Sequence, residues 1–73
     1  MPQLHIIGWR HGLKAVSMIM LLKEELLLGL EEATGCVDRV LNNETVVLDV
    51  NDLAKAHELA HKLEVLGVDV IQK

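Results

Sequence analysis

Aromatic side chains are almost absent from this sequence of 73 residues: Trp9 is the only one, and Phe and Tyr do not occur. A stacking platform for single-stranded nucleic acid needs several aromatic faces, which this chain cannot supply. Positive charge is also scarce, with 7 Lys and Arg residues against 11 Asp and Glu residues and a net charge of −4. This balance disfavours attraction to phosphate backbones, so we expect no nucleic-acid partner.

Cysteine and long apolar runs are scarce as well. Cys36 is the only cysteine, which excludes an internal disulfide and a thiolate metal cluster and fits a reducing compartment. We interpret it as a small core residue. The longest apolar stretch of the first predicted helix, residues 18–22, is closed by Lys23, far short of the roughly 20 residues of a membrane span. We expect no signal segment at the start of the protein, because no basic-then-apolar pattern is found there. We expect a cytoplasmic protein with no membrane association and no cofactor.

Aliphatic residues dominate what remains, since 51% of the sequence is hydrophobic. Length and composition fit one domain over residues 1–73 with a core of Leu, Val, Ile, Met and Ala. β-Branched runs indicate strands, and apolar residues at helical spacing indicate helices. Either Asn51 or Asp52 is expected to cap the last helix, and Gly67 to end it. The predicted elements are a strand at 4–7 ending at Gly8, a turn at 9–12, helices at 13–27 and 30–41, a strand at 45–50, a helix at 53–66 and a strand at 68–71.

The order of these elements, β-α-α-β-α-β, restricts the topology. A single helix between the second and third strands requires a right-handed crossover, which makes those two strands parallel. The first strand can lie between them, antiparallel to both. We therefore expect an α+β fold, a two-layer sandwich with a three-stranded sheet and three helices on one of its faces.

Several segments resemble the C-terminal domain of the bacterial ribosomal stalk protein, and the resemblance covers nearly the whole chain. The substrate adaptor of the Clp protease has the same fold class and resembles this chain in outline. The resemblance implies the α+β architecture above. The matching segments are the first strand at 4–7, Gly12, residues 19–23 of the first helix, the junction at 28–33, the last helix, Gly67 and the strand that leads to Lys73.

The stalk domain recruits translation factors through basic residues on its first two helices. Of the matching positions, only Lys23 keeps a positive charge, whereas Ala15, Met20, Glu31 and Thr34 stand where the family usually has lysines. The electrostatic attraction that such a surface supplies is therefore missing. A role at the ribosome or on another cellular machine remains an alternative hypothesis.

The sharpest local motif is His57-Glu58-Leu59-Ala60-His61, which matches the His-Glu-x-x-His signature of zinc peptidases. Both histidines would bind zinc, and Glu58 would be the general base. No third ligand follows downstream, and Glu64 stands where one large subgroup has glycine. The helical projection also places His57 and His61 on the solvated face. Two exposed histidines are the simpler interpretation. The alternatives are a weak surface metal site at His57 and His61, with Glu64 as a candidate further ligand, and a zinc-dependent hydrolase.

The first helix is apolar on almost every side up to Lys23, more than one packed face can bury. Methionine-rich apolar surface is typical of contacts with protein partners. Trp9 and Arg10 are of the types enriched at binding hot spots, although Trp9 can also cover the end of the sheet. Our leading hypothesis is a protein-interaction module, not an enzyme, that binds a protein partner or a second copy through the first two helices. The candidate residues are Trp9, Arg10, Met20, Lys23, Leu27 and Leu28.

Overall fold

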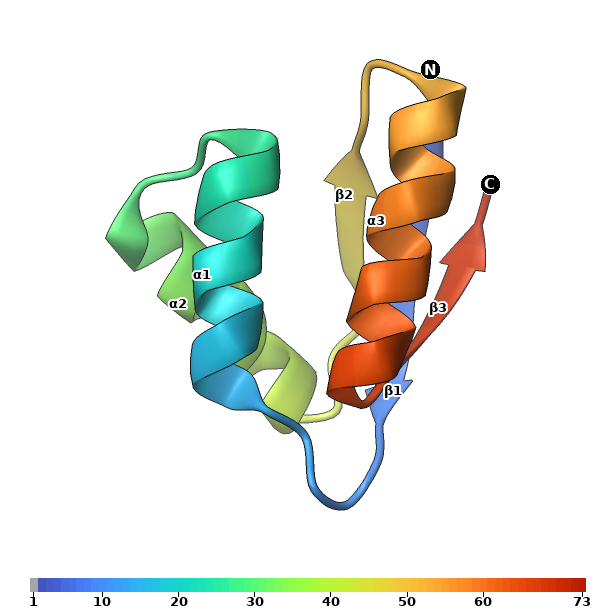
Figure 1. Cartoon of the computed structure of the whole chain (residues 1–73). Coiled ribbons are helices and arrows are strands. Elements are labelled where there is room, and N and C mark those ends of the chain that lie inside the picture. The colour runs from blue at the N-terminus through green and yellow to red at the C-terminus, as the bar shows by residue number, and fades with distance from the viewer. Residues whose placement is uncertain (1) are drawn as a thin grey trace.

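The computed structural model describes residues 2–73, which form three strands and three helices (Figure 1). The observed order is β-α-α-β-α-β, as the sequence predicts. The elements are β1 (Gln3–Trp9), α1 (Ala15–Leu26), α2 (Leu30–Leu41), β2 (Val46–Asp49), α3 (Leu53–Leu66) and β3 (Val68–Gln72).

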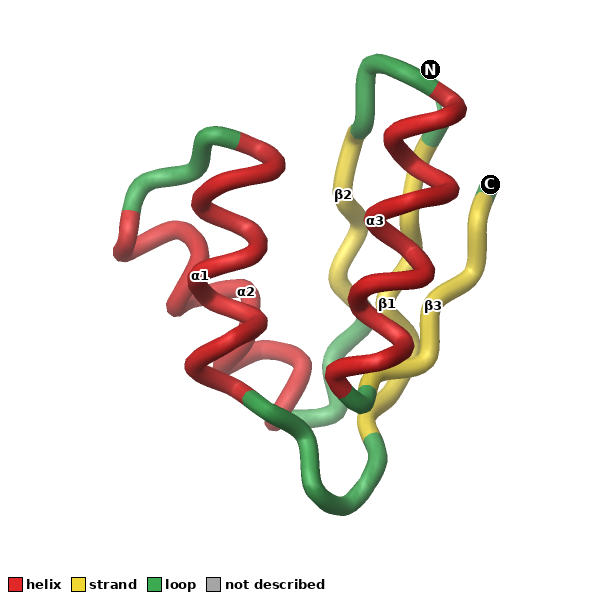
Figure 2. The backbone as a smooth tube through the Cα atoms, viewed as in Figure 1, coloured by secondary structure: helices red, strands yellow, loops and turns green. Residues whose placement is uncertain are grey.

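The three strands form one antiparallel sheet in the order β2-β1-β3 (Figure 2). β1 lies in the middle, and His5 pairs with Val47 on one side and with Ile71 on the other. Because β2 and β3 are both antiparallel to β1, they run in the same direction, as the crossover through α3 requires. The predicted α+β class and strand arrangement are confirmed.

The core lies between the helices and one face of the sheet, because side chains alternate between the two faces of a strand. Leu4 and Ile6 of β1 are completely buried, whereas Ile7 is exposed on the opposite face. α2 and α3 pack on the strands, and α1 packs against α2 and α3. The fully buried core side chains are aliphatic and come from every element: Leu4, Ile6, Met18, Leu22, Val37, Val40, Val46, Val50, Leu59, Leu63 and Val68.

β1 is longer than the sequence predicts. The strand does not end at Gly8 but continues to Trp9, which pairs with Val68, and the register shifts between Ile6 and Gly8. The shift places Ile7 as an extra residue in β1, so that Gly8 and Trp9 can still pair with β3. The prediction of a turn beginning at Trp9 is therefore wrong. The turn begins at Arg10, whose backbone N–H donates to the carbonyl of Gly67.

Local capping sets the limits of α3. Asp52 is the N-cap, and its carboxylate accepts a hydrogen bond of 2.8 Å from the backbone N–H of Ala54. At the other end Gly67 adopts a left-handed conformation, with φ at 116°, and its N–H donates to the carbonyls of Leu63 and Glu64. These are the start and stop signals that the sequence predicts.

Within residues 2–73, no helix combines the length and apolarity needed to traverse a bilayer.

Candidate protein-binding surface

The predicted contact residues do not gather on one face of α1 and α2. Met20 lies on α1 and borders a groove shared with α3. Leu27 and Leu28 belong to the α1–α2 loop, where they border a different hollow. Trp9 and Arg10 lie at the end of β1. Lys23, in the last turn of α1, is half-buried.

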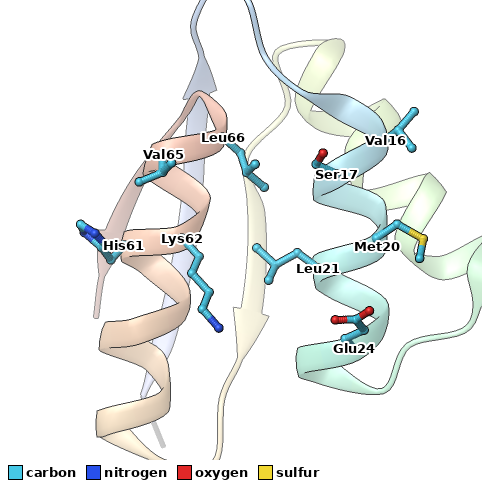
Figure 3. Close-up of a pocket in the computed structure, with 9 residues that line it drawn as sticks. All are labelled: Val16, Ser17, Met20, Leu21, Glu24, His61, Lys62, Val65 and Leu66. Carbon is cyan, nitrogen blue, oxygen red and sulfur yellow. The ribbon is translucent and has the colours of Figure 1, made fainter.

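An apolar groove of about 490 Å³ runs between α1 and α3 (Figure 3). Leu21 and Leu66 extend into the space between the two helices, while Val16 and Met20 lie along the outer side of α1. Val16 and Val65 are 75% and 72% exposed, and Met20 is 48% exposed. The apolar excess of the first helix is therefore not covered within the monomer. It leaves the kind of adaptable surface that a protein partner can bury.

The polar residues of this groove have mixed charge. Lys62 points from α3 toward α1, where its Nζ lies 2.7 Å from Oε1 of Glu25 and 3.0 Å from Oε1 of Glu58. The hydrogen bond from Lys62 lowers the pKa of the Glu25 carboxyl, and the same bond raises the pKa of Lys62. Glu24 borders the groove and has no ion-pair partner within residues 2–73. The uncompensated charge at the groove is therefore negative.

Arg10 is held by its neighbours in the monomer. Its Nη1 donates to Oδ1 of Asp69 over 2.8 Å, and its Nη2 donates to the carbonyl of Glu64. These bonds connect the end of β1 to β3 and to the last turn of α3. Trp9 remains 39% exposed beside it. Arg10 therefore has a structural role that accounts for its position without a partner.

The α1–α2 loop carries the most exposed large apolar side chain of the described residues. Leu27 adopts a left-handed conformation with φ at 55° and is 89% exposed. Leu28 and Cys36 line a hollow of about 440 Å³ with β2 and the loop that follows it. Cys36 packs against the core, as the sequence predicts, and burial raises the pKa of its thiol. A raised pKa disfavours the thiolate that a nucleophile needs.

His57 and His61 lie on the exposed side of α3, as the helical projection predicts. Nδ1 of His57 is 2.8 Å from Oε1 of Gln72, and His61 borders the groove between α1 and α3. Glu64 lines the same small hollow as the two histidines. Within residues 2–73, no group of three or more His, Cys, Asp or Glu side chains is placed to hold a metal ion. The two-histidine site stays a prediction, without the third protein ligand that catalytic zinc sites have.

Val65 is the groove residue that sequence reasoning missed. It lies one turn after His61 and off the buried stripe of Ala56, Leu59, Ala60 and Leu63. The sequence did contain one signal for it: Val65 is an apolar residue on the otherwise solvated side of an amphipathic helix. Its neighbours on α1 could not be predicted, because periodicity within one helix does not tell which helix packs beside it.

No protein-family model matches the sequence, and no curated protein matches it. The resemblance to the ribosomal stalk domain therefore stays a prediction.

Proposed function

We propose that this domain is a small protein-interaction module that binds an amphipathic helix of a partner protein in the groove between α1 and α3. The observation that carries the proposal is the exposure of Val16, Met20 and Val65 around one groove in the monomer. Met20 belongs to the surface that the sequence predicts, but the second wall of the groove is α3 and not α2.

The shape of the groove favours a helix as the bound element. Its walls are two helices, and the residues that line it recur at a spacing of four: Val16 and Met20 on α1, and His61 and Val65 on α3. Such rows form ridges that accept the i, i+3, i+4 and i+7 side chains of a third helix. Burial of these side chains supplies the main driving force, because apolar area removed from water contributes about 25 cal/mol per Å².

The charge of the groove indicates which charges the partner helix carries. Lys62 is already neutralised by Glu25 and Glu58, whereas Glu24 is free within the described part of the chain. The chain as a whole carries a net charge of −4. Complementary charge steers encounter and fixes orientation. The proposed partner helix therefore has basic residues beside its apolar ridge.

Fluorescence anisotropy with two labelled helical peptides tests this function. Both peptides have leucines at i, i+4 and i+7, and the positions beside this ridge are lysine in one and glutamate in the other. The lysine peptide is expected to bind more tightly than the glutamate peptide. Met20→Asp and Val65→Asp should each weaken its binding by about tenfold or more, because each puts a charge into the apolar contact.

Leu53→Asp is the matched control, because Leu53 is similarly exposed but lies at the start of α3, outside the groove. This variant should bind the lysine peptide as the unaltered protein does. Equal binding of both peptides, or equal losses in all three variants, would contradict a helix-binding groove between α1 and α3.

A further inference from the structure

The outer face of the sheet is the second apolar surface of the molecule. No helix of the described residues 2–73 covers it, and three of its side chains are close to half exposed: Ile7 at 49%, Val47 at 47% and Ile71 at 41%. Val47, His5 and Ile71 form one row across the sheet, since His5 pairs with both of the others. This surface lies opposite the face of the sheet on which α2 and α3 pack, so it is separate from the groove between α1 and α3.

Most polar groups on this face are already satisfied within the monomer. Gln3 Nε2 donates to Oδ1 of Asp49 over 3.0 Å, and Nε2 of His5 lies 3.2 Å from Oε1 of Gln3. Near the other end, Asp69 is paired with Arg10. Covering polar groups that already have hydrogen-bond partners costs much less than covering unpaired ones. The face can therefore be buried without leaving these groups unsatisfied.

A second row contains opposite charges at its two ends. Gln3 pairs with Asp49 of β2 on one side, and its backbone N–H and C=O bond to Lys73 on the other side. Side chains two residues apart on a strand share a face, so Lys73 is on the same face as Ile71. Counted from β2 to β3, one row is Asp49, Gln3 and Lys73, and the other row is Val47, His5 and Ile71. Negative charge lies on the β2 side of the face and positive charge on the β3 side.

This arrangement is self-complementary. A two-fold axis parallel to β1 and lying between two stacked sheets places β2 of one copy over β3 of the other. Val47 then faces Ile71 of the second copy, and Asp49 faces Lys73, with each contact made twice. Ile7 of one copy faces Ile7 of the other. A two-fold axis perpendicular to the strands would instead place the charged row of one copy near Ile7 of the other, so the charges would not pair.

We infer that the outer face of the sheet is the interface of a homodimer, in which two copies stack their sheets about 10 Å apart with Asp49 of each against Lys73 of the other. The face spans three strands about 4.8 Å apart and about five residues per strand. Three strands by five residues cover roughly 250 Å² per copy, which is below the usual range for stable specific interfaces, so the dimer is weak and forms at high protein concentration. It leaves the groove between α1 and α3 free in both copies.

Sedimentation equilibrium of the full chain from about 10 μM to 1 mM tests the dimer. The average mass is expected to rise toward twice the monomer mass. Asp49→Lys and Lys73→Glu should each shift self-association to concentrations at least about tenfold higher, because like charges then face each other. An equimolar mixture of the two variants should restore association, since both contacts become attractive in the mixed dimer.

Further variants separate this interface from folding and from the groove. Val47→Thr keeps a β-branched residue in the strand but removes an apolar contact, so it should weaken the dimer while the circular dichroism spectrum is unchanged. Met20→Asp, on the groove, should leave the dimer intact. A constant monomer mass at every concentration, a mixture no stronger than its components, or loss of the dimer in Met20→Asp would each overturn the proposal.

Discussion

Gly67 is a residue whose replacement the backbone tolerates poorly. Its φ of 116° is a region that L side chains rarely adopt, and a Cβ there would lie 3.0 Å from Cα of Leu13. The carbonyl of Gly67 also accepts the backbone N–H of Arg10, which holds the β1–α1 loop against the end of α3. Strain and crowding therefore act at the same position.

Gly67→Ala is expected to lower the free energy of unfolding by about 1–3 kcal/mol. Urea denaturation measures the change. Gly35→Ala is the matched control, because Gly35 is inside α2 with no atom near the added Cβ, and there alanine should raise stability by about 0.5–1 kcal/mol. Equal effects at the two glycines would show that the left-handed conformation does not determine the cost.

A residue-scale pH dependence follows from Glu25 and Lys62, which connect α1 to α3. The folded state lowers the pKa of Glu25, so its contribution to stability is present above the unfolded pKa and is lost as pH falls through the folded pKa. The raised pKa of Lys62 has the opposite sign, and its contribution is lost only as pH rises through the folded value. Chemical denaturation of the unaltered protein and of Glu25→Gln checks this: the variant should be less stable at neutral pH, and the difference should vanish in acid. A difference independent of pH would contradict the ion pair.

At the scale of the element, α3 has two faces with different roles. Leu63 is completely buried in the core, whereas Val65 is 72% exposed at the groove. Leu63→Ala is expected to lower the free energy of unfolding by about 2–5 kcal/mol, because it leaves a cavity. Val65→Ala should change stability by less than about 0.5 kcal/mol. Thermal and urea unfolding of both variants measures these effects. A large loss with Val65→Ala would mean that Val65 stabilises the fold, not a partner contact.

The limits of the elements show what a sequence of this kind can predict. α2 and α3 were predictable because their signals are local: acidic residues after Gly29, an Asp52 cap and a Gly67 stop. The end of β1 was not, because Gly8 usually weakens a strand, and here a bulge lets the pairing continue to Trp9. That pairing depends on β3, about 60 residues later in the chain. Local propensity contains no information about it.

At the scale of the whole molecule, the crossover rule predicted that β2 and β3 are parallel, and placing β1 between them, as the element order allows, gives the observed sheet order. The candidate surface could be deduced only in part. The apolar excess on α1 predicted that the core cannot bury all of its apolar side chains, Met20 among them. Which helix lies beside Met20 could not be predicted, because the packing of α1 against α2 and α3 depends on how all three helices fit together. The exposed row on the sheet that contains Val47 and Ile71 could not be predicted, because its residues come together only when the strands pair.

The pairing of Gln3 with Lys73 determines how the domain responds to mechanical load. Residues 3 and 73 are hydrogen-bonded neighbours on antiparallel strands, so tension applied between them opens the β1–β3 ladder one rung at a time. Tension between residues 9 and 73 would instead act along the strands and strain all the rungs together. Optical-tweezer experiments with handles at these two pairs of sites should show rupture at clearly lower tension for the first pair. A domain that is loaded through residues 3 and 73 would therefore unfold at low force.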